Sequence, residues 1–361
     1  MTASPTVASP DAGSAPAPEA GTTPPDGAAP VGGTVEVPPS RRNKLIVLIV
    51  LLLAFAALLG VAIWYLLFRQ PIPVVPPIPG ETKMPGYVTS VIGLERPMGI
   101  AVNADGSRIY TSTTDGERVA MIFDAGGNKL AVLRPPVSTG TDHVPVYLAL
   151  DPQTGDVYVS DRPTGKVYVY DSAGTYLRAF EPPASLTGWQ PLGLAFDAAG
   201  NFYATDVSAN PQVVHKFDRS GALVMDYGTA DLLSFPNGVA VDAAGNVYIA
   251  DSNNGRLLAY APDGTLVAQV GRGVGKGNLG MPRGIAVSSD NKVYVVDSTG
   301  QAVSVFTTVK EGQRTLDFLG TFGGEGIGDG KFEFPNGLAL DGRGRVYIAD
   351  SANNRVQIWS Y

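Results

Sequence analysis

The sequence predicts an all-β fold, a six-bladed β-propeller, from three observations. The stretch 235–251, FPNGVAVDAAGNVYIAD, returns at 334–350 as FPNGLALDGRGRVYIAD, with 12 of 17 positions identical. Looser copies of the same pattern recur at spacings of 45 to 53 residues. Each copy holds short apolar runs separated by turn residues. A repeat of about 45 residues with four short strands is the sequence signature of a β-propeller.

One repeat illustrates the four strands. Apolar runs occupy residues 239–242, 247–250, 257–260 and 266–270. Gly245 lies in the tight turn between the first two runs, where glycine can take a positive φ. A single meander of this kind cannot cover both of its faces, so we expect neighbouring copies to stack on one another.

The chain begins with a biased segment. Residues 1–40 contain nine prolines and no lysine or arginine. They show no apolar periodicity, so they cannot bury enough surface to offset the entropy of ordering them. We therefore expect residues 1–40 to form a disordered tail.

A transmembrane anchor is predicted at residues 41–69. Residues 45–68 contain no charged side chain, and 24 residues are enough to cross a bilayer as a helix. The alternative is a cleavable signal peptide, whose apolar region is shorter and ends at a small-residue cleavage site. Arg41, Arg42 and Lys44 precede the span, and only Arg69 follows it closely. The positive-inside rule then places the tail in the cytoplasm and the C-terminal domain outside, at the cell membrane.

A proline-rich stalk is expected at residues 70–85, and the propeller at residues 86–361. The six copies end at Thr113, Asp161, Asp206, Asp251, Asp297 and Asp350. The last copy has room for only three strands. The run 87–93 is a spare strand, and its pairing with the last copy would close the ring and hide the open edges.

These motifs resemble those of a known family. The pattern Pro-x-Gly-Val/Ile-Ala-Val-Asp, then Gly-x-Val-Tyr-Ile-Ala-Asp, then Asn-x-Arg-Val is similar to NHL repeats, over about residues 86–361. Two copies depart from it, because Thr113 replaces the aspartate and Tyr147 replaces the glycine after Pro145. The resemblance implies a membrane-anchored, extracytoplasmic binding, sensor or adaptor domain.

The aspartates that end the second strands are interpreted as structural. Aspartate before a turn accepts hydrogen bonds from nearby backbone N–H groups, and one such residue per blade suggests a repeated turn fastener. The residues assigned this role are Asp161, Asp206, Asp251, Asp297 and Asp350. A ring of metal ligands is the alternative.

The predicted binding surface is the face that joins the Pro-x-Gly starts to the loops between second and third strands. These loops are longer and more varied than the turns on the other face, and function tends to lie on such loops. Trp189 and Tyr147 are predicted to contact a partner there, with burial between blades as the alternative for each. The full predicted set is Tyr147, Trp189, Asn237, Asn254, Arg283, Asn336 and Arg355.

The sequence favours a binding domain over an enzyme. The chain has two histidines and no cysteine, too few for a histidine-rich zinc site, and we predict no cofactor or metal. The net charge of −7 argues against a nucleic-acid partner, so the expected partner is a protein or another extracellular ligand. The alternative function is a metal-dependent lactonase or esterase, an activity that other six-bladed propellers carry.

Overall fold

The computed structural model describes residues 41–68, 82–136, 142–208, 211–273 and 275–361. The chain divides into two compact units, Met1–Pro76 and Pro77–Tyr361. The expected tail at 1–40 and residues 70–81 of the expected stalk lie outside the described residues.

Helix α1 (Arg41–Phe68) is the described element of the first unit. Its 28 residues correspond to a length of about 42 Å at the α-helical rise per residue. The window Lys44–Val61 has a mean hydropathy of 2.9, and none of it is buried within the structure. By length and composition, α1 can cross a membrane.

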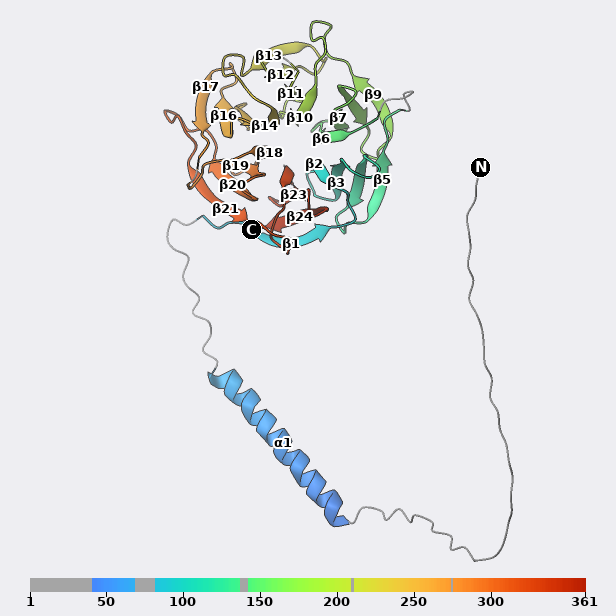
Figure 1. Ribbon diagram of the computed structural model, residues 1–361, viewed down its shortest axis with the longest axis vertical. Helices are drawn as coiled ribbons and strands as arrows, with labels where there is room; N and C mark the ends of the chain where they lie inside the picture. The colour runs from blue at the N-terminus through green and yellow to red at the C-terminus, as the bar shows by residue number, and fades with distance from the viewer. Residues whose placement is uncertain (1–40, 69–81, 137–141, 209–210, 274) are drawn as a thin grey trace, which may run out of the picture. The chain divides into compact units, whose positions relative to one another are not determined.

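The second unit is a closed ring of six four-stranded antiparallel sheets (Figure 1), which confirms the predicted all-β propeller. We number the sheets as blades 1 to 6 and give their strands from the channel outward. Blades 1 to 3 are β2 (Pro97–Val102), β3 (Arg108–Thr113), β4 (Ala120–Asp124), β5 (Lys129–Leu133); β6 (Pro145–Leu150), β7 (Val157–Asp161), β8 (Lys166–Tyr170), β9 (Tyr176–Phe180); and β10 (Pro191–Phe196), β11 (Phe202–Asp206), β12 (Val213–Phe217), β13 (Leu223–Tyr227). Blades 4 to 6 are β14 (Pro236–Val241), β15 (Val247–Asp251), β16 (Arg256–Tyr260), β17 (Leu266–Val270); β18 (Pro282–Val287), β19 (Lys292–Asp297), β20 (Ala302–Thr307), β21 (Phe318–Gly323); and β22 (Pro335–Leu340), β23 (Val346–Asp350), β24 (Arg355–Ser360), β1 (Gly86–Val91).

The core lies between neighbouring blades. The second strand of each blade is buried on both of its faces, and in β15 all five residues are buried. Tyr248 and Leu257 of blade 4, for example, share one apolar cluster with Val293 and Val295 of blade 5. Each blade therefore depends on its neighbours for burial of its apolar faces, as stacked repeats do.

The ring is closed by strand pairing between distant parts of the chain. Strand β1 pairs antiparallel with β24, with Gly86 opposite Ser360 and Val91 opposite Val356. Ser351 of blade 6 also donates a hydrogen bond to the backbone oxygen of Pro97 in blade 1. Blade 6 thus obtains its outermost strand from the start of the unit, and none of its long edges is left open.

The glycine of each Pro-x-Gly motif marks a close approach between adjacent innermost strands. A Cβ placed on Gly238 would lie 2.2 Å from the backbone oxygen of Arg283, and one on Gly337 would lie 2.5 Å from that of Met98. Separations this short exclude any side chain with a Cβ unless the strands move. The innermost strands consequently approach one another most closely where the motif lies. Blade 2 is the exception, because Tyr147 occupies the position of the motif glycine there.

Candidate functional site

The two faces of the propeller follow from the strand register. Pro236 lies opposite Asp251, and Pro335 opposite Asp350, so motif starts and second-strand ends share one face. We call it the Pro-x-Gly face. The opposite side, formed by the turns between first and second strands at 103–107, 151–156, 197–201, 242–246, 288–291 and 341–345, is the hairpin-turn face.

The side chain of Tyr147 spans the channel at the Pro-x-Gly face. The backbone N–H of Tyr147 donates to the hydroxyl of Ser160 at 3.1 Å, as the N–H groups of the motif glycines Gly99 and Gly193 donate to the hydroxyls of Ser112 and Thr205. Its side chain extends across the ring, and the phenol donates to Oδ1 of Asn336 at 2.8 Å, with Oδ1 of Asn237 at 3.4 Å. Burial raises the pKa of the phenol to about 12, so Tyr147 stays a neutral donor at physiological pH. One side chain therefore joins blades 2, 4 and 6.

Apolar side chains surround this polar bridge. Val146, Tyr147 and Leu192 form a small buried cluster, and Met98 and Phe235 pack against it while remaining partly exposed. Asn237 is held inside the cluster because its Nδ2 donates to the hydroxyl of Ser252 at 2.7 Å and to the backbone oxygen of Phe235 at 3.2 Å. The channel mouth on this face combines fixed amides with an apolar rim.

Arg283 adds a positive charge to this mouth. It occupies the middle position of the Pro-x-Gly motif in blade 5, as Asn237 and Asn336 do in blades 4 and 6. Its positive charge opposes the rise in the pKa of Tyr147, which places the two side chains near each other. Its Nη2 lies 3.1 Å from the sulfur of Met281. Its Nε is buried and has no hydrogen-bond acceptor among the described residues.

The structure thus brings Tyr147, Asn237, Arg283 and Asn336 together, whereas three other predicted site residues have internal contacts. Trp189 is 7% exposed, and its ring packs against Phe180 and Phe217, which matches the burial alternative rather than the surface contact. Asn254 donates to Asp251 and to the backbone oxygen of Leu232.

Arg355 likewise serves the fold. It is 9% exposed and donates to Asp350 at 2.8 Å and to the backbone oxygens of Gly328 and Lys331. These bonds tie the loop between blades 5 and 6 to blade 6. In this structure the guanidinium of Arg355 has few donors left for a partner, in contrast to the surface role predicted for it.

The five aspartates predicted as turn fasteners each accept at least one backbone N–H from the segment before the first strand of their own blade. The donors are Val144 to Asp161, Gln190 to Asp206, Ser234 to Asp251, Gly280 and Met281 to Asp297, and Glu333 to Asp350, over 2.7 to 3.1 Å. Each carboxylate therefore fixes the conformation of the loop that leads into the innermost strand of its blade.

Both histidines contact these aspartates. Nδ1 of His143 lies 3.2 Å from Asp161, and His215 lies between Asp206 and Asp226. Among the residues that the structure describes, no group of three or more histidine, cysteine, aspartate or glutamate side chains is arranged to hold a metal ion.

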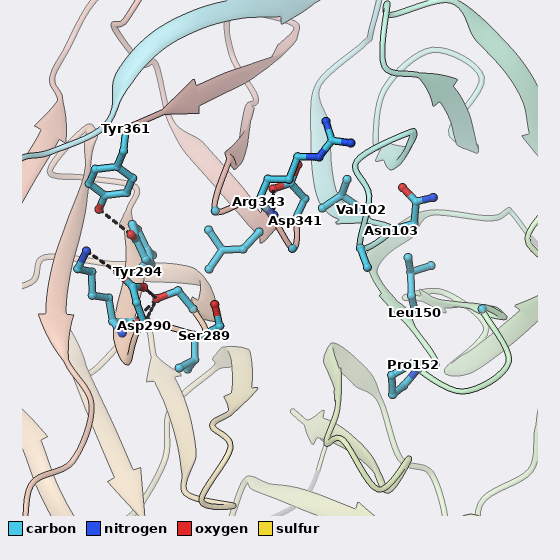
Figure 2. A pocket seen from close by; sticks show the side chains of 18 of the residues that line it. Val102, Asn103, Leu150, Pro152, Ser289, Asp290, Tyr294, Asp341, Arg343 and Tyr361 are labelled. Atoms are coloured by element: carbon cyan, nitrogen blue, oxygen red, sulfur yellow. Dashed lines mark hydrogen bonds and ion pairs between the residues drawn. The ribbon is translucent and has the colours of Figure 1, made fainter.

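A pocket that sequence reasoning missed opens on the hairpin-turn face. It has a volume of about 810 Å³ and is lined by turns of blades 1, 2, 5 and 6. Figure 2 shows Asn103 and Leu150 on one side of it, Asp290 and Tyr294 on the other, and Arg343 between them. The pocket shares Val102, Leu150, Val287 and Leu340 with a second cavity of about 320 Å³ that follows the innermost strands. The channel is therefore open on this side.

One wall of the pocket is fixed by contacts between blades 5 and 6. Tyr361 and Tyr294 share a hydrogen bond of 2.6 Å between their hydroxyls. Lys292 pairs with Asp290 at 2.7 Å and lies over the Tyr361 ring, 4.7 Å from its centroid. Burial lowers the pKa of Lys292, but the hydrogen bonds and charges of Asp290 and Tyr361 together outweigh it, so the net shift is upward. The turn signals of the individual repeats were visible in the sequence, but their convergence into one pocket was not.

Comparison with sequences of known proteins supports the repeat assignment. The model of the NHL repeat matches residues 233–260, 279–306 and 332–359, which lie in blades 4, 5 and 6. Protein lin-41 of Caenorhabditis elegans is 59% identical over 39 residues, or 11% of this chain and 3% of that protein. The uncharacterized protein YncE of Escherichia coli is 28% identical over 89 residues, or 24% of this chain and 25% of that protein. The chain therefore spans only a quarter or less of the length of these two relatives.

Comparison with solved structures supports the fold. A protein of unknown function from Bacteroides thetaiotaomicron superposes with a TM-score of 0.58 at 17% identity, over 78% of this chain and 73% of that one. Virginiamycin B lyase from Staphylococcus aureus gives 0.52 at 14% identity, over 77% and 99% of the two chains. At these identities the similarity extends to the fold alone. The chain thus contains three matched NHL repeats within a six-bladed β-propeller.

Proposed function

We propose that this propeller is a binding or adaptor domain that recognises a protein partner through its Pro-x-Gly face. The observation that carries the proposal is the side chain of Tyr147, which spans the channel at that face. A mouth obstructed in this way suits contact with another protein better than admission of a small substrate. The NHL-repeat propeller fold is consistent with this role.

Exposed apolar side chains at strained positions support this choice of face. Phe334 is 53% exposed and Leu232 is 76% exposed, and both adopt a positive φ, of 47° and 49°. A left-handed backbone costs a bulky residue about 1–3 kcal/mol, and such strain tends to occur at binding sites. The N–H of Phe334 is fixed by Gln301 of blade 5, at 2.7 Å. The chain thus uses a contact between blades to hold an apolar ring in solvent.

A capture experiment tests the proposal. We expect crosslinking in cells, followed by purification of the full chain, to recover a protein partner. Phe334→Ala should reduce that recovery severalfold, because apolar anchors account for much of the affinity of protein interfaces. Leu177→Ala is the matched control, since Leu177 is an exposed apolar residue on the outermost strand of blade 2. Unchanged capture by the Phe334→Ala and Arg283→Gln variants would rule out the Pro-x-Gly face.

We further propose that α1 anchors the chain in the cell membrane, with its N-terminus in the cytoplasm and the propeller outside. The apolar span and the basic residues before it support this arrangement. Protease added to intact cells should then degrade residues 86–361 and spare a tag at the N-terminus. Recovery of a secreted form that begins near residue 57 or 70 would instead show a cleaved signal peptide.

An enzymatic function is the alternative, and the open channel on the hairpin-turn face is the observation that favours it. The pocket volume of about 810 Å³ falls within the range of small-molecule sites. A metal-dependent lactonase or esterase would need oxygen or nitrogen ligands gathered around a cation, and the described residues contain no such group. Hydrolysis of a lactone panel that stops on addition of a chelator would favour the enzyme.

A further inference from the structure

The Pro-x-Gly face has an excess of hydrogen-bond donors at its channel mouth. Arg283 supplies a guanidinium, whose five N–H donors cannot be removed by deprotonation. Its Nε is buried without an acceptor in the described part of the chain, and its Nη2 meets only a methionine sulfur, which is a weak acceptor. A buried donor without a partner destabilises the site, so this arrangement favours a ligand that supplies an acceptor.

The neighbouring polar groups do not supply an acceptor for the Nε of Arg283. The side-chain oxygens of Asn336 and Asn237 lie 2.8 and 3.4 Å from the hydroxyl of Tyr147, whose single proton points to the nearer one, that of Asn336. What Asn336 retains is its amide N–H₂, another donor. The middle positions of the six Pro-x-Gly motifs include no aspartate or glutamate. The mouth therefore combines Arg283 with further donors inside the apolar rim of Met98 and Phe235, and the guanidinium of Arg162 lies over the Phe235 ring, 5.8 Å from its centroid.

We propose that this mouth binds a carboxylate of the protein partner, with Arg283 as the anion-binding residue and the rim in contact with the adjacent apolar side chain. This inference rests on the proposed function and specifies the chemistry of the partner. A carboxylate fits because a guanidinium can bind its two oxygens through a pair of parallel hydrogen bonds. A mouth with Arg283 and one neighbouring arginine, in a chain of net charge −7, suits one carboxylate better than the polyanionic backbone of a nucleic acid.

Two probes of equal shape test the charge requirement on the full chain in detergent. The first probe, N-acetylphenylalanine, carries an apolar ring and a carboxylate. The second probe, N-acetylphenylalanine amide, has a neutral carboxamide in place of the carboxylate. We expect the acid to bind with a Kd of about 1 mM by ligand-observed NMR, since a small contact gives only weak affinity. The amide should bind about tenfold more weakly or worse, because a charge-assisted bond is lost.

Variants assign the binding to Arg283. Arg283→Gln should abolish the preference for the acid, whereas Arg283→Lys should keep part of it, since a lysine retains the charge without the planar fork. Arg343→Gln is the matched control, because Arg343 is an exposed arginine beside the pocket of the hairpin-turn face. An unchanged melting temperature would show that each variant is folded.

To separate the two sources of a carboxylate, the acid is compared with an acetylated peptide amide whose only carboxylate is an internal aspartate. If only the acid binds, the mouth recognises a C-terminal carboxylate. If the acid and the peptide bind equally well, the mouth also recognises aspartate side chains. Equal affinity for acid and amide, no binding of either at about 10 mM, or better competition by a short RNA would overturn the inference. If the Phe334→Ala variant still loses its partner in that case, the proposed function stands without the carboxylate site.

Discussion

The hydroxyl of Tyr147 in blade 2 lies 2.8 Å from the side-chain oxygen of Asn336 in blade 6, across the channel. In five of the six blades glycine occupies the position of Tyr147. This contact therefore turns a repeated backbone junction into a side-chain bridge across one end of the channel.

The Tyr147→Phe substitution tests the strength of that bridge. We expect it to lower the free energy of unfolding by about 1–3 kcal/mol, because the oxygen of Asn336 would be left buried without its donor. The measurement is urea unfolding of the full chain. Tyr176→Phe is the control, since Tyr176 lies on the outermost strand of blade 2 and its hydroxyl has no hydrogen-bond partner among the described residues. Equal losses in the two variants would contradict the bridge.

Asp251→Ala should destabilise blade 4. Asp251 is fully buried, and it accepts from the N–H of Ser234 at 2.7 Å and from Arg256 at 2.7 Å. Removal of one partner of a buried ion pair costs about 3–5 kcal/mol. The same unfolding measurement applies, with Asp263→Ala as a comparison because Asp263 lies in an exposed hairpin turn. A small effect at position 251 would refute the fastener role.

Stability should fall as the pH rises past neutrality, and His215 should account for part of the change. Burial lowers the pKa of His215, but its hydrogen bonds to Asp206 and Asp226 and the negative charges of these carboxylates together outweigh burial, and the net shift is upward. A raised pKa stabilises the fold fully below the unfolded value of about 6.5, and this stabilisation is lost as the pH passes the folded value. Melting temperatures between pH 6 and pH 9 should decline less steeply in His215→Gln. A slope identical to that of the natural chain would exclude His215 as the cause.

Low pH should remove a second contribution to the stability of the fold, that of Asp206, which contacts His215. Burial raises the pKa of Asp206, but hydrogen bonds from His215, Gln190 and Ser208 outweigh it and lower the pKa to about 2. The stabilisation is present above the unfolded value of about 3.9 and disappears as the pH falls towards 2. Asp206→Asn should thus show a smaller loss of stability between pH 4 and pH 2. If both proteins lose the same amount, another carboxylate is responsible.

Removal of β1 should weaken the whole propeller. A chain that starts at residue 84 keeps β1, whereas one that starts at residue 95 leaves β24 with an open edge. We expect a single cooperative thermal transition for the first chain and a strongly lowered melting temperature for the second. Val91→Asp in the full chain is an independent check, because it places a charge opposite buried Val356 without truncation. Identical melting temperatures of all three would contradict a stabilising role for β1.

The fold was predictable because it repeats. Short apolar runs and turn residues recur six times, and the near-identity of 235–251 and 334–350 sets the period without knowledge of the structure. The NHL resemblance and the all-β propeller are both confirmed.

The site was less predictable, because it depends on single residues that break the repeat. The sequence shows Tyr147 in place of glycine, but the distances between blades 2, 4 and 6 decide whether its hydroxyl reaches Asn336. The burial of Trp189 likewise depends on where Phe180 and Phe217 lie in the blade. In the sequence Arg355 has the features of a surface residue, but in the structure its guanidinium donates to the backbone of the loop 328–331. Repetition therefore reveals the scaffold, and departures from it need the three-dimensional structure.

The pairing of β1 with β24 has a consequence for the synthesis of the chain. Gly86 and Ser360 are 274 positions apart, so β1 leaves the ribosome long before its partner exists. At about 5–20 residues per second, β1 waits roughly 14–55 seconds for β24. During that interval its unpaired edge is available to any other strand nearby, including one from a second nascent copy. A chaperone that shields residues 86–91 until translation ends would protect this protein from domain-swapped assembly.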